Sequence, residues 1–478
     1  MLFNTLQYAI FFAVVFVVSW LLIGKPWWRR LFLLAASYFF YGTWDWRFLG
    51  LLAISTATDY FVGLRMGGLP KDQRKRWLWI SIVVNLVILG FFKYFNFFTD
   101  SAVNLLQTFG MNADAPTLQI ILPVGISFYT FQTMAYTIDV YRGKTDVCKD
   151  PVVFALYVAY FPPLVAGPIE RAQNLIPQLY KTPTAFCSTE AGRAVFLICI
   201  GLIKKVVIGD YLAVNFVDRV YASPSSYSSL EILLGIYSYA VQIYCDFSGY
   251  TDIAIGCAAL LGVRLTLNFD SPYKSRNLQE YWRRWHMSLS DWLRDYLYIP
   301  LGGSRTTNFK IYRNLMITMV LGGLWHGAGW NFVFWGFLHG SILCLTRAWQ
   351  RWHGTEKRVE KLDSLWTVSK YVFCVFLTFN FLGVGWIFFR SASFEKAWAM
   401  IRQISTLTYY TPNLHTWVVI ALVVGLVSHY VPKRLFEWTR NRFAASPWYV
   451  QGALLFVVAY VLRESASAEA VPFIYFQF

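Results

Sequence analysis

The stretch LGGLWHGAGWNFVFWGFLHG (residues 321–340) places a glycine-rich turn between two apolar runs. The first run, from Ile311 to Trp325, is about 15 residues long and would extend roughly 22 Å as a helix. The hydrocarbon core of a bilayer is about 30 Å thick, so we expect the turn to lie inside the membrane. Non-helical backbone is tolerated at that depth only where protein buries it or water reaches it. The stretch therefore predicts a turn that faces a cavity.

Apolar runs of this kind recur along the whole chain. Most of them have the roughly 17–25 residues that a membrane helix needs. Backbone groups in hydrocarbon must pair within their own segment, so we expect helices and not strands. The runs lie at 6–23, 31–44, 47–63, 77–98, 118–140, 194–215, 230–262, 311–325, 328–346, 366–389, 414–431 and 448–463. The pattern predicts an all-α polytopic membrane protein with about 11–12 transmembrane helices.

The composition favours the same class. The chain has 478 residues, of which 57% are hydrophobic and 14% are charged, and so few charges cannot cover soluble domains. An aromatic content of 19% excludes disorder. No repeat or linker divides the chain, so residues 1–478 are expected to form a single membrane domain. The 6–23 run lacks the flanks of a signal peptide and is expected to be a retained span.

The distribution of charge predicts the orientation in the membrane. The 65–76 loop carries five basic residues and one acidic residue, whereas 99–117 has two acidic residues and no basic residue. By the positive-inside rule the first loop faces the cytoplasm and the second faces outside, and 264–310, 347–365 and 433–442 fall in the cytoplasm. The net charge of +16 is therefore a topology signal. Because these bases lie in short loops between spans, we expect no nucleic-acid partner.

Two segments are not expected to be simple spans. Residues 272–305, PYKSRNLQEYWRRWHMSLSDWLRDYLYIPLGGSR, are too charged to cross lipid and too rich in Trp, Tyr and Leu to lie free in water. An amphipathic helix at the cytoplasmic interface, or one that dips into the protein, fits both facts. Residues 152–166 are expected to form another interfacial or re-entrant segment.

His326 is the strongest candidate for chemistry among the six histidines. Glycines stand at 322, 323, 327 and 329 around it, and Trp325 and Trp330 flank it as walls. Glycines let a backbone or a ligand approach closely, and an ionisable group at membrane depth is a functional candidate. The alternative is a histidine that hydrogen-bonds between packed helices, but the density of glycine favours a functional role.

His286 lies in YWRRWHMSLS (281–290) and is the second candidate. At helical spacing it shares a face with Trp282 and lies near Ser290. A structural histidine on a basic interfacial helix is an equally good interpretation. His339, on an apolar arm, is expected to be a core hydrogen bonder, and His353 lies in a charged loop.

Several common catalytic motifs are missing from the sequence: a GxSxG elbow, a P-loop, a GxGxxG after a strand, and HExxH. The seven cysteines are spread singly, with no spacing that could close a metal site, so no metal is expected. What remains is a polytopic protein with one or two candidate histidines and a basic, aromatic cytoplasmic face. An acyl transferase, a phosphoryl transferase and a transporter are all compatible with it.

Several blocks of the sequence resemble the membrane-bound O-acyltransferase family. They are PVGISFYTFQTMAY (123–136), FPPLVAGPIER (161–171), IYCDFSGYTDIAIG (243–256), NLQEYWRRWHMSLSDWLRDYLYIPLGG (277–303), LGGLWHGAGWNFVFWGFLHG (321–340) and PFIYFQF (472–478). The similarity is greatest to the branch that acetylates bacterial exopolysaccharides such as alginate. The blocks around the two histidines are the most specific, whereas Cys245 and Thr251 stand where the family more often has Phe and Ser.

The resemblance implies that His326 is the catalytic histidine and that His286 is a second functional histidine on the cytoplasmic side. It implies a ring of helices around a thin centre, pierced by a tunnel from a cytoplasmic acyl thioester, expected to be acetyl-CoA, to an acceptor outside. The acceptor is expected to be an exopolysaccharide such as alginate or cellulose, or a periplasmic acetyltransferase partner. The expected location is the bacterial inner membrane, with no bound cofactor.

Acetyl transfer to a hydroxyl needs a base, because a hydroxyl is a weak nucleophile near neutral pH, and the neutral imidazole of His326 is the candidate. A tetrahedral oxyanion needs hydrogen-bond donors. The candidate donors are Trp325, Trp330, Asn331 and the amides of the turn. The phosphates of coenzyme A suit the basic 264–310 face, where the candidates are Arg283, Arg284 and Arg294.

Two alternatives stay open from the sequence. A transporter or flippase of an activated donor would have polar residues along several spans, whereas here they concentrate in two blocks. Transfer of D-alanine to teichoic acid keeps the enzyme class but changes the substrates, and the ending PFIYFQF favours the exopolysaccharide branch instead.

Overall fold

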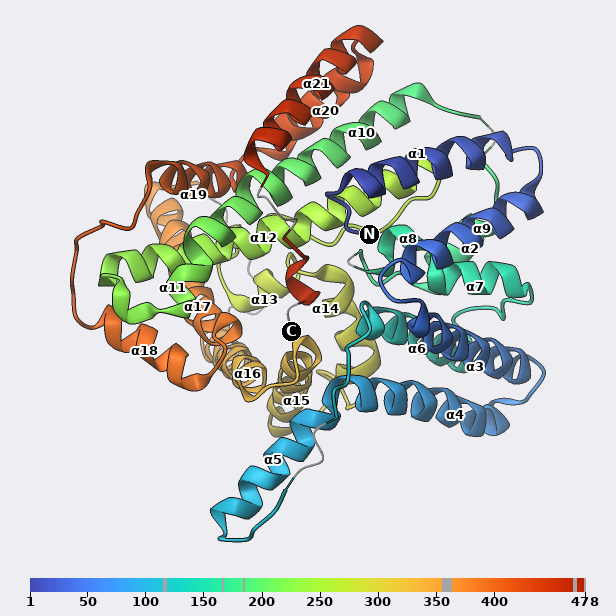
Figure 1. The fold of residues 1–478 in the computed structure, drawn as a ribbon. Coiled ribbons are helices and arrows are strands. Elements are labelled where there is room, and N and C mark those ends of the chain that lie inside the picture. The colour runs from blue at the N-terminus through green and yellow to red at the C-terminus, as the bar shows by residue number, and fades with distance from the viewer. Residues whose placement is uncertain (115–117, 166, 184, 355–362, 467–470, 477–478) are drawn as a thin grey trace.

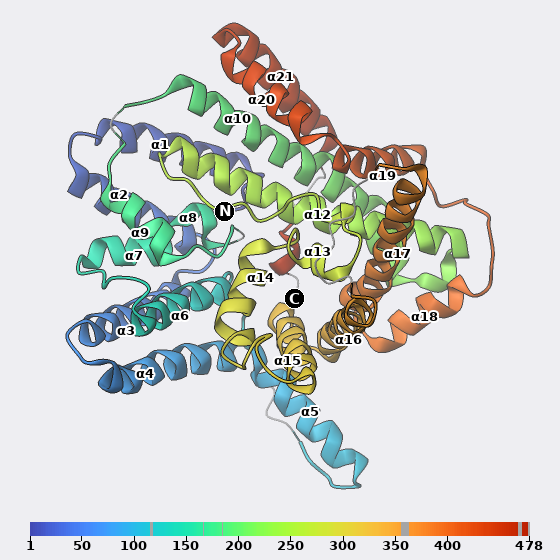
Figure 2. The same cartoon turned by 180° about the vertical axis from the view of Figure 1, so that it is seen from behind.

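The computed structural model describes residues 1–114, 118–165, 167–183, 185–354, 363–466 and 471–476. Every regular element in these ranges is helical, which confirms the all-α prediction. Figures 1 and 2 show the helices arranged around a centre that holds two short helices, α13 (Leu278–Trp282) and α14 (Met287–Leu293), together with the 472–476 segment. The centre therefore consists of segments that are far apart in the sequence.

The first part of the chain forms one flank of this arrangement. Its α-helices are α1 (Leu6–Leu21), α2 (Pro26–Gly42), α3 (Leu49–Gly67), α4 (Lys71–Leu89), α5 (Phe95–Thr108), α6 (Ile126–Arg142), α7 (Pro151–Ala159), α8 (Phe161–Leu164) and α9 (Ala172–Tyr180), with a 3-10 turn η1 (Trp46–Phe48) and a π-helical turn η2 (Gly90–Tyr94). The 152–166 segment forms α7 and α8, which have 9 and 4 residues and are too short to cross a bilayer. Their side chains are largely buried inside the protein.

The middle of the chain contains the longest described helix, α12 (Ser229–Leu260), with 32 residues. A capping box starts it: Glu231 N–H donates to Ser228 Oγ, and Ser228 N–H donates to the Glu231 carboxylate. The neighbouring elements are α10 (Ser188–Leu202), η3 (Ile203–Asp210), η4 (Ala213–Val217), α11 (Asp218–Ala222), η5 (Pro224–Ser226), η6 (Pro272–Lys274) and η7 (Arg294–Tyr298). Because η3, η4 and η7 are π-helical, they mark local distortions of longer helices.

The last part begins with the hairpin predicted around the glycine turn. Its elements are α15 (Asn308–His326), α16 (Trp330–Trp352), α17 (Leu365–Arg390), α18 (Phe394–Ile404), α19 (Thr416–His429), α20 (Lys433–Ala445), α21 (Trp448–Ser465) and η8 (Ile474–Phe476). The helix before the turn has 19 residues, not the 15 of the apolar run, because it starts at polar residues ahead of Ile311. A Cβ on Gly323 would clash with Phe332 O, and a Cβ on Gly336 would clash with Met319 O. Glycine therefore lets α15 and α16 pack with their backbones in contact.

Two described helical stretches are long and apolar enough to cross a membrane, Lys71–Thr108 and Leu365–Arg390. The pair α19 and α20, bent by 98°, would make a third if it counts as one broken span. The apolar α1 has only 16 residues. The larger number of spans predicted from apolar runs also counts such shorter helices and helices that carry charges.

Candidate active site

His326 is the last residue of α15 and is only 3% exposed. Its ring lies 5.1 Å from Trp335, 5.4 Å from Phe389 and 5.6 Å from Tyr475, measured between centroids. Neither ring nitrogen has a hydrogen-bond partner among the described residues. The imidazole is therefore held by aromatic packing, with both nitrogens free to meet a substrate.

A cavity of about 200 Å³ opens beside His326. It is lined by Trp44, Lys93, Leu122, Pro123, Val124, Gly125, Ile126, Ser127, Phe128, Trp325, His326, Pro472 and Tyr475. The sequence predicted a cavity at the glycine turn itself. The cavity instead adjoins the two residues that precede the turn, Trp325 and His326, because Phe332 packs against Gly327 and fills the space there.

Trp325 lies between the two candidate histidines. Its ring is 5.2 Å from His326 and 5.9 Å from His286. Phe128 and Phe131 cover its other sides at 5.3 and 5.5 Å. The indole N–H is buried and has no acceptor within the described ranges, so it is available to a reacting group. His286, Trp325, His326 and Tyr475 form a continuous cluster, called here the aromatic chamber.

His286 occupies the break between α13 and α14, where its backbone is left-handed with φ of 44°. The sequence treated this segment as one helix, and the structure corrects that, because a left-handed residue cannot continue a right-handed helix. His286 is fully buried, so of the two placements predicted for this segment the one that dips into the protein agrees with the structure. Burial lowers the pKa of this histidine, which lies outside the membrane-spanning helices, to about 3. It is therefore neutral at physiological pH.

The 472–476 segment closes the chamber and was not recognised from the sequence as part of the site. Ile474 N–H donates to Asp246 Oδ2 at 2.8 Å, and Tyr475 packs on both His326 and His286. Asp246 also pairs with Lys205 at 2.5 Å, and Lys205 pairs with Asp210 at 2.6 Å. The available signal was the presence of charged residues inside apolar runs, since buried charges in a membrane protein are costly and usually functional.

Lys93 is a second residue that the sequence analysis missed. Its ammonium group donates to Trp325 O at 2.6 Å, to His326 O at 3.3 Å and to Ser127 Oγ at 3.3 Å. These carbonyls belong to the C-terminal end of α15, where a positive charge stabilises the helix. Lys93 thus fixes the end of the helix that carries His326 and also lines the cavity.

Trp330 and Asn331, two predicted oxyanion donors, begin α16 on the other side of the turn. Trp330 is 58% exposed, and its indole N–H donates to Ser101 Oγ at 3.1 Å. The Asn331 amide donates to Ser391 O at 2.7 Å. Neither side chain lines the cavity beside His326. Of the predicted donors, the structure brings the side chain of Trp325 to the chamber.

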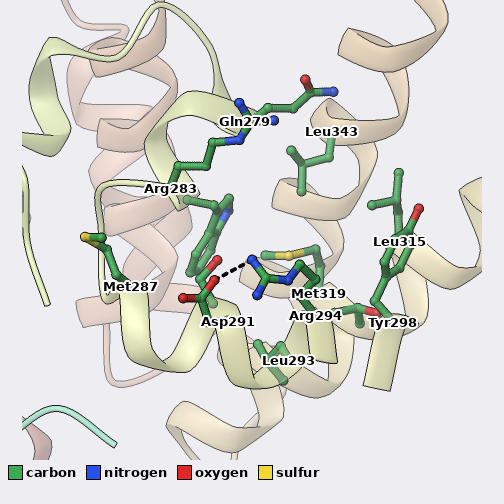
Figure 3. A pocket seen from close by; sticks show the side chains of 13 residues that line it. Gln279, Arg283, Met287, Asp291, Leu293, Arg294, Tyr298, Leu315, Met319 and Leu343 are labelled. Atoms are coloured by element: carbon green, nitrogen blue, oxygen red, sulfur yellow. Dashed lines mark hydrogen bonds and ion pairs between the residues drawn. The ribbon is translucent and has the colours of Figure 1, made fainter. Parts of the chain in front are cut away.

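A second cavity, of about 280 Å³, lies between the 279–298 segment and the hairpin helices (Figure 3). Two of the three predicted arginines, Arg283 and Arg294, line it, and Arg294 forms an ion pair with Asp291 at 2.6 Å. The third, Arg284, instead pairs with Glu280 at 3.0 Å. The basic side chains at this cavity fit an anionic ligand.

An aromatic layer separates the two cavities. Trp282 lines the second cavity and lies 5.8 Å from Trp335, which in turn contacts His326. Along α15, Met319 lines the second cavity and His326 lines the first, and seven residues of helix span about 10 Å. His326 therefore lies at the first cavity, about two helical turns along α15 from the second.

The other histidines do not join the chamber. His339 is fully buried, with its ring 4.3 Å from Trp335, but neither of its nitrogens has a partner in the part of the chain that the structure describes. The predicted core position is confirmed, whereas the predicted hydrogen bond is wrong, because aromatic rings surround the imidazole. His353 is exposed, and its Nδ1 lies 3.0 Å from Trp349 O. No metal-binding group of three or more His, Cys, Asp or Glu residues occurs among the described residues.

Comparisons with known proteins agree with these features. A model of the membrane-bound O-acyltransferase family (MBOAT) matches residues 149–380. The probable alginate O-acetylase AlgI of Azotobacter vinelandii is 44% identical over 374 residues, which cover 78% of this chain and 72% of that protein. The protein of the same name from Pseudomonas putida is 37% identical over the full length of both chains. The peptidoglycan O-acetyltransferase of Helicobacter pylori is 36% identical over 84% of this chain and 79% of its own.

Proposed function

This chain belongs to the membrane-bound O-acyltransferase family and is a membrane O-acetyltransferase, and from that premise we propose that its donor is cytoplasmic acetyl-CoA. The acetyl group passes through the aromatic chamber to a hydroxyl acceptor on the outer side of a bacterial inner membrane. The acceptor is a polysaccharide, reached directly or through a periplasmic acetyltransferase partner. Alginate and peptidoglycan are the proposed polymers, since relatives of this similarity are named for them.

The buried, unpartnered imidazole of His326 is the observation that carries this proposal. It lines the cavity that also contains Lys93, and the cavity lined by Arg283 and Arg294 meets the same helix at Met319, seven residues earlier. By the charge distribution of the sequence, the arginine-lined cavity belongs to a segment on the cytoplasmic side. Such an arrangement suits a reaction in which donor and acceptor approach one base from opposite sides.

The chemistry follows from the needs of ester formation. The acceptor hydroxyl attacks the thioester carbonyl while His326 takes its proton. This proton transfer raises the rate by about 10²–10⁴-fold. The tetrahedral oxyanion is stabilised by the free indole N–H of Trp325. Collapse of the intermediate breaks the carbon–sulfur bond, and the coenzyme A thiolate takes the proton back from the imidazolium. The products are an acetyl ester outside and free coenzyme A inside.

The second cavity fits the donor. Arg283 and Arg294 suit phosphate groups, because a guanidinium binds phosphate oxygens in a bidentate manner. Its apolar lining, from Leu293, Leu315 and Met319, suits the uncharged part of the donor that leads to the thioester. A transporter of an intact donor would need a path for its phosphates through the chamber, where the described side chains are mainly aromatic.

The proposal is tested in vesicles that contain the purified protein. Acetyl-CoA with a radiolabelled acetyl group is placed on the cytoplasmic side, and polymannuronate or peptidoglycan, with or without a periplasmic acetyltransferase, is placed on the other. Label is expected as an ester on the acceptor side, with free coenzyme A on the donor side and no label in vesicles that contain H326A.

Other outcomes point to other functions. Intact acetyl-CoA on the acceptor side, without ester, would establish a transporter. Transfer of labelled D-alanine from a carrier protein, with no transfer of label from acetyl-CoA, would establish the teichoic acid reaction.

A further inference from the structure

We infer that Asn268 is a positioning residue that fixes the tautomer of His286, with the proton on Nδ1, so that Nε2 presents a lone pair to the aromatic chamber. The inference deepens the proposed function and rests on it for its catalytic consequence. The structural part, the location of one proton, stands on the contacts around Asn268 alone.

The identity of the Asn268 side-chain atoms is fixed by a backbone group. Ser288 N–H lies 3.1 Å from the Asn268 atom assigned as Oδ1. A backbone N–H can only donate, so the atom opposite it must be the amide oxygen and not the nitrogen. Ser288 Oγ reaches the same oxygen at 2.9 Å and accepts from Ile169 N at 3.0 Å, so its own proton is directed at Asn268. Two donors therefore define this oxygen.

The same oxygen lies 3.2 Å from Nδ1 of His286. A carbonyl oxygen is only an acceptor, so Nδ1 must carry the hydrogen. A neutral imidazole has one N–H and one lone pair, which leaves the lone pair on Nε2. That nitrogen is buried and has no partner among the described residues. It is therefore an unsatisfied acceptor among the rings of the chamber.

Asn268 also holds the backbone that aims the ring. Met287 N–H donates to Asn268 O at 2.9 Å, directly after the left-handed His286. The ring that results faces Phe128 from α6, Phe247 from α12, Trp325 from α15 and Tyr475 from η8. Among the titratable side chains near the ring, Tyr475 lies 6.5 Å from it and His326 packs on Trp325, and α12 also carries Asp246 next to Phe247. One residue thus sets both the direction and the protonation of this imidazole.

The consequence is a division of roles at the proposed site. A His286 with Nε2 as acceptor holds a donor group, such as the acceptor hydroxyl or an amide N–H of the thioester substrate, in one orientation. With the opposite tautomer it would present an N–H and repel the same donor. Fixing one tautomer in advance removes a reorganisation step from the reaction, as carbonyl groups that accept from the other ring nitrogen do for metal-binding histidines.

The tautomer is read directly by ¹⁵N NMR of the full-length protein in nanodiscs with labelled histidine, using H286Q to assign the ring signals by difference. We expect an N–H signal for Nδ1 and the signal of an unprotonated nitrogen for Nε2 of His286. A protonated Nε2 in the wild-type protein would overturn the inference, whatever the protein does to acetyl-CoA. A wild-type protein without transferase activity would refute the proposed function and leave this measurement valid.

The catalytic consequence is tested with paired variants at Asn268. N268D keeps an oxygen that accepts from His286 and replaces the amide nitrogen, which has no partner within the described ranges. The negative charge of the new carboxylate favours the protonated form of His286. We expect the rising limb of the pH–rate profile to move to higher pH, because a neutral ring then requires a higher pH. N268L removes the acceptor and is expected to lower kcat by about 10²-fold, with KM for acetyl-CoA within about twofold.

Ser288 supplies the matched control, because S288A removes a neighbouring donor to Oδ1 and keeps the Asn268 contact with His286. S288A also removes the acceptor of Ile169 N, so kcat is expected to fall by up to about tenfold, but the pH profile is expected to stay that of the wild-type protein. An unchanged pH profile in N268D would overturn the role of Asn268. The N268D pH profile tests the role of Asn268 even where N268L fails to insert into the membrane.

Discussion

The two histidines of the chamber are both buried, yet the protein holds them in opposite ways. His286 is anchored through Nδ1 to Asn268 and sits at a left-handed break between two short helices. His326 ends a 19-residue helix, and neither of its nitrogens is anchored within the described part of the chain. A ring with one fixed tautomer suits an acceptor that holds a group still. A ring with two free nitrogens suits a base that takes a proton and returns it.

H326A should produce the largest effect, because it removes the group proposed to take the proton. We expect acetyl transfer to fall by about 10³-fold or more, toward the upper end of what general base catalysis supplies. The measurement is ester formation in vesicles, normalised to the amount of inserted protein. More than a few per cent of wild-type activity in well-inserted H326A would remove this residue from the role of base.

H286A should have a smaller effect than H326A, since an acceptor that orients a group contributes less than the base. We expect a loss of about 10²-fold, mainly in kcat, with folding retained because the ring makes a single hydrogen bond within the described residues. If H286A is as inactive as H326A, the division of roles is wrong and the two rings act as one unit. The double variant measures this coupling.

The sequence predicted much of the site because its strongest signals are local. Glycines next to His326 and tryptophans beside it lie within ten residues, and the apolar runs predicted helices without strands. The sequence did not predict the roles of Lys93, Asn268 and the 472–476 segment, because those roles depend on partners far along the chain. Lys93 and Trp325 are 232 residues apart, and Asp246 and Ile474 are 228 residues apart. Periodicity carries no information on such pairings. The left-handed conformation of His286 is likewise imposed by tertiary contacts.

K93M tests whether the anchoring of α15 supports the unanchored ring of His326. The variant keeps the length of the side chain and removes the charge that caps Trp325 O and His326 O. A charge at a helix end contributes up to about 2 kcal/mol in a buried site, so K93M should lower the free energy of unfolding by about that amount and should reduce activity through the lost anchoring of His326. K93R should restore most of it. Y94F is the matched control, because it removes one neutral hydrogen bond to Leu324 O in the same turn and should cost only a few-fold.

D246N tests the support of the 472–476 segment and should act mainly on stability. Lys205 and Asp246 are almost fully buried, so weakening their pair is expected to lower the free energy of unfolding by about 3 kcal/mol. D252N is the matched control, because the Lys204–Asp252 pair joins the same two elements but is partly exposed, and its loss should cost about 1 kcal/mol. Equal shifts in thermal unfolding would contradict a special role for the pair that holds Ile474.

W330F should have the smallest effect and sharpens the comparison between the two sides of the glycine turn. Trp325 presents a free indole N–H to the chamber, whereas Trp330 is exposed and donates to Ser101. W325F should therefore lower kcat by about 10²-fold, the loss expected when one oxyanion donor is removed. W330F should change it by less than about twofold, because an exposed hydrogen bond contributes little. Since both changes remove one N–H from tryptophans that flank the same histidine, equal losses would contradict the assignment of the oxyanion donor to the indole of Trp325.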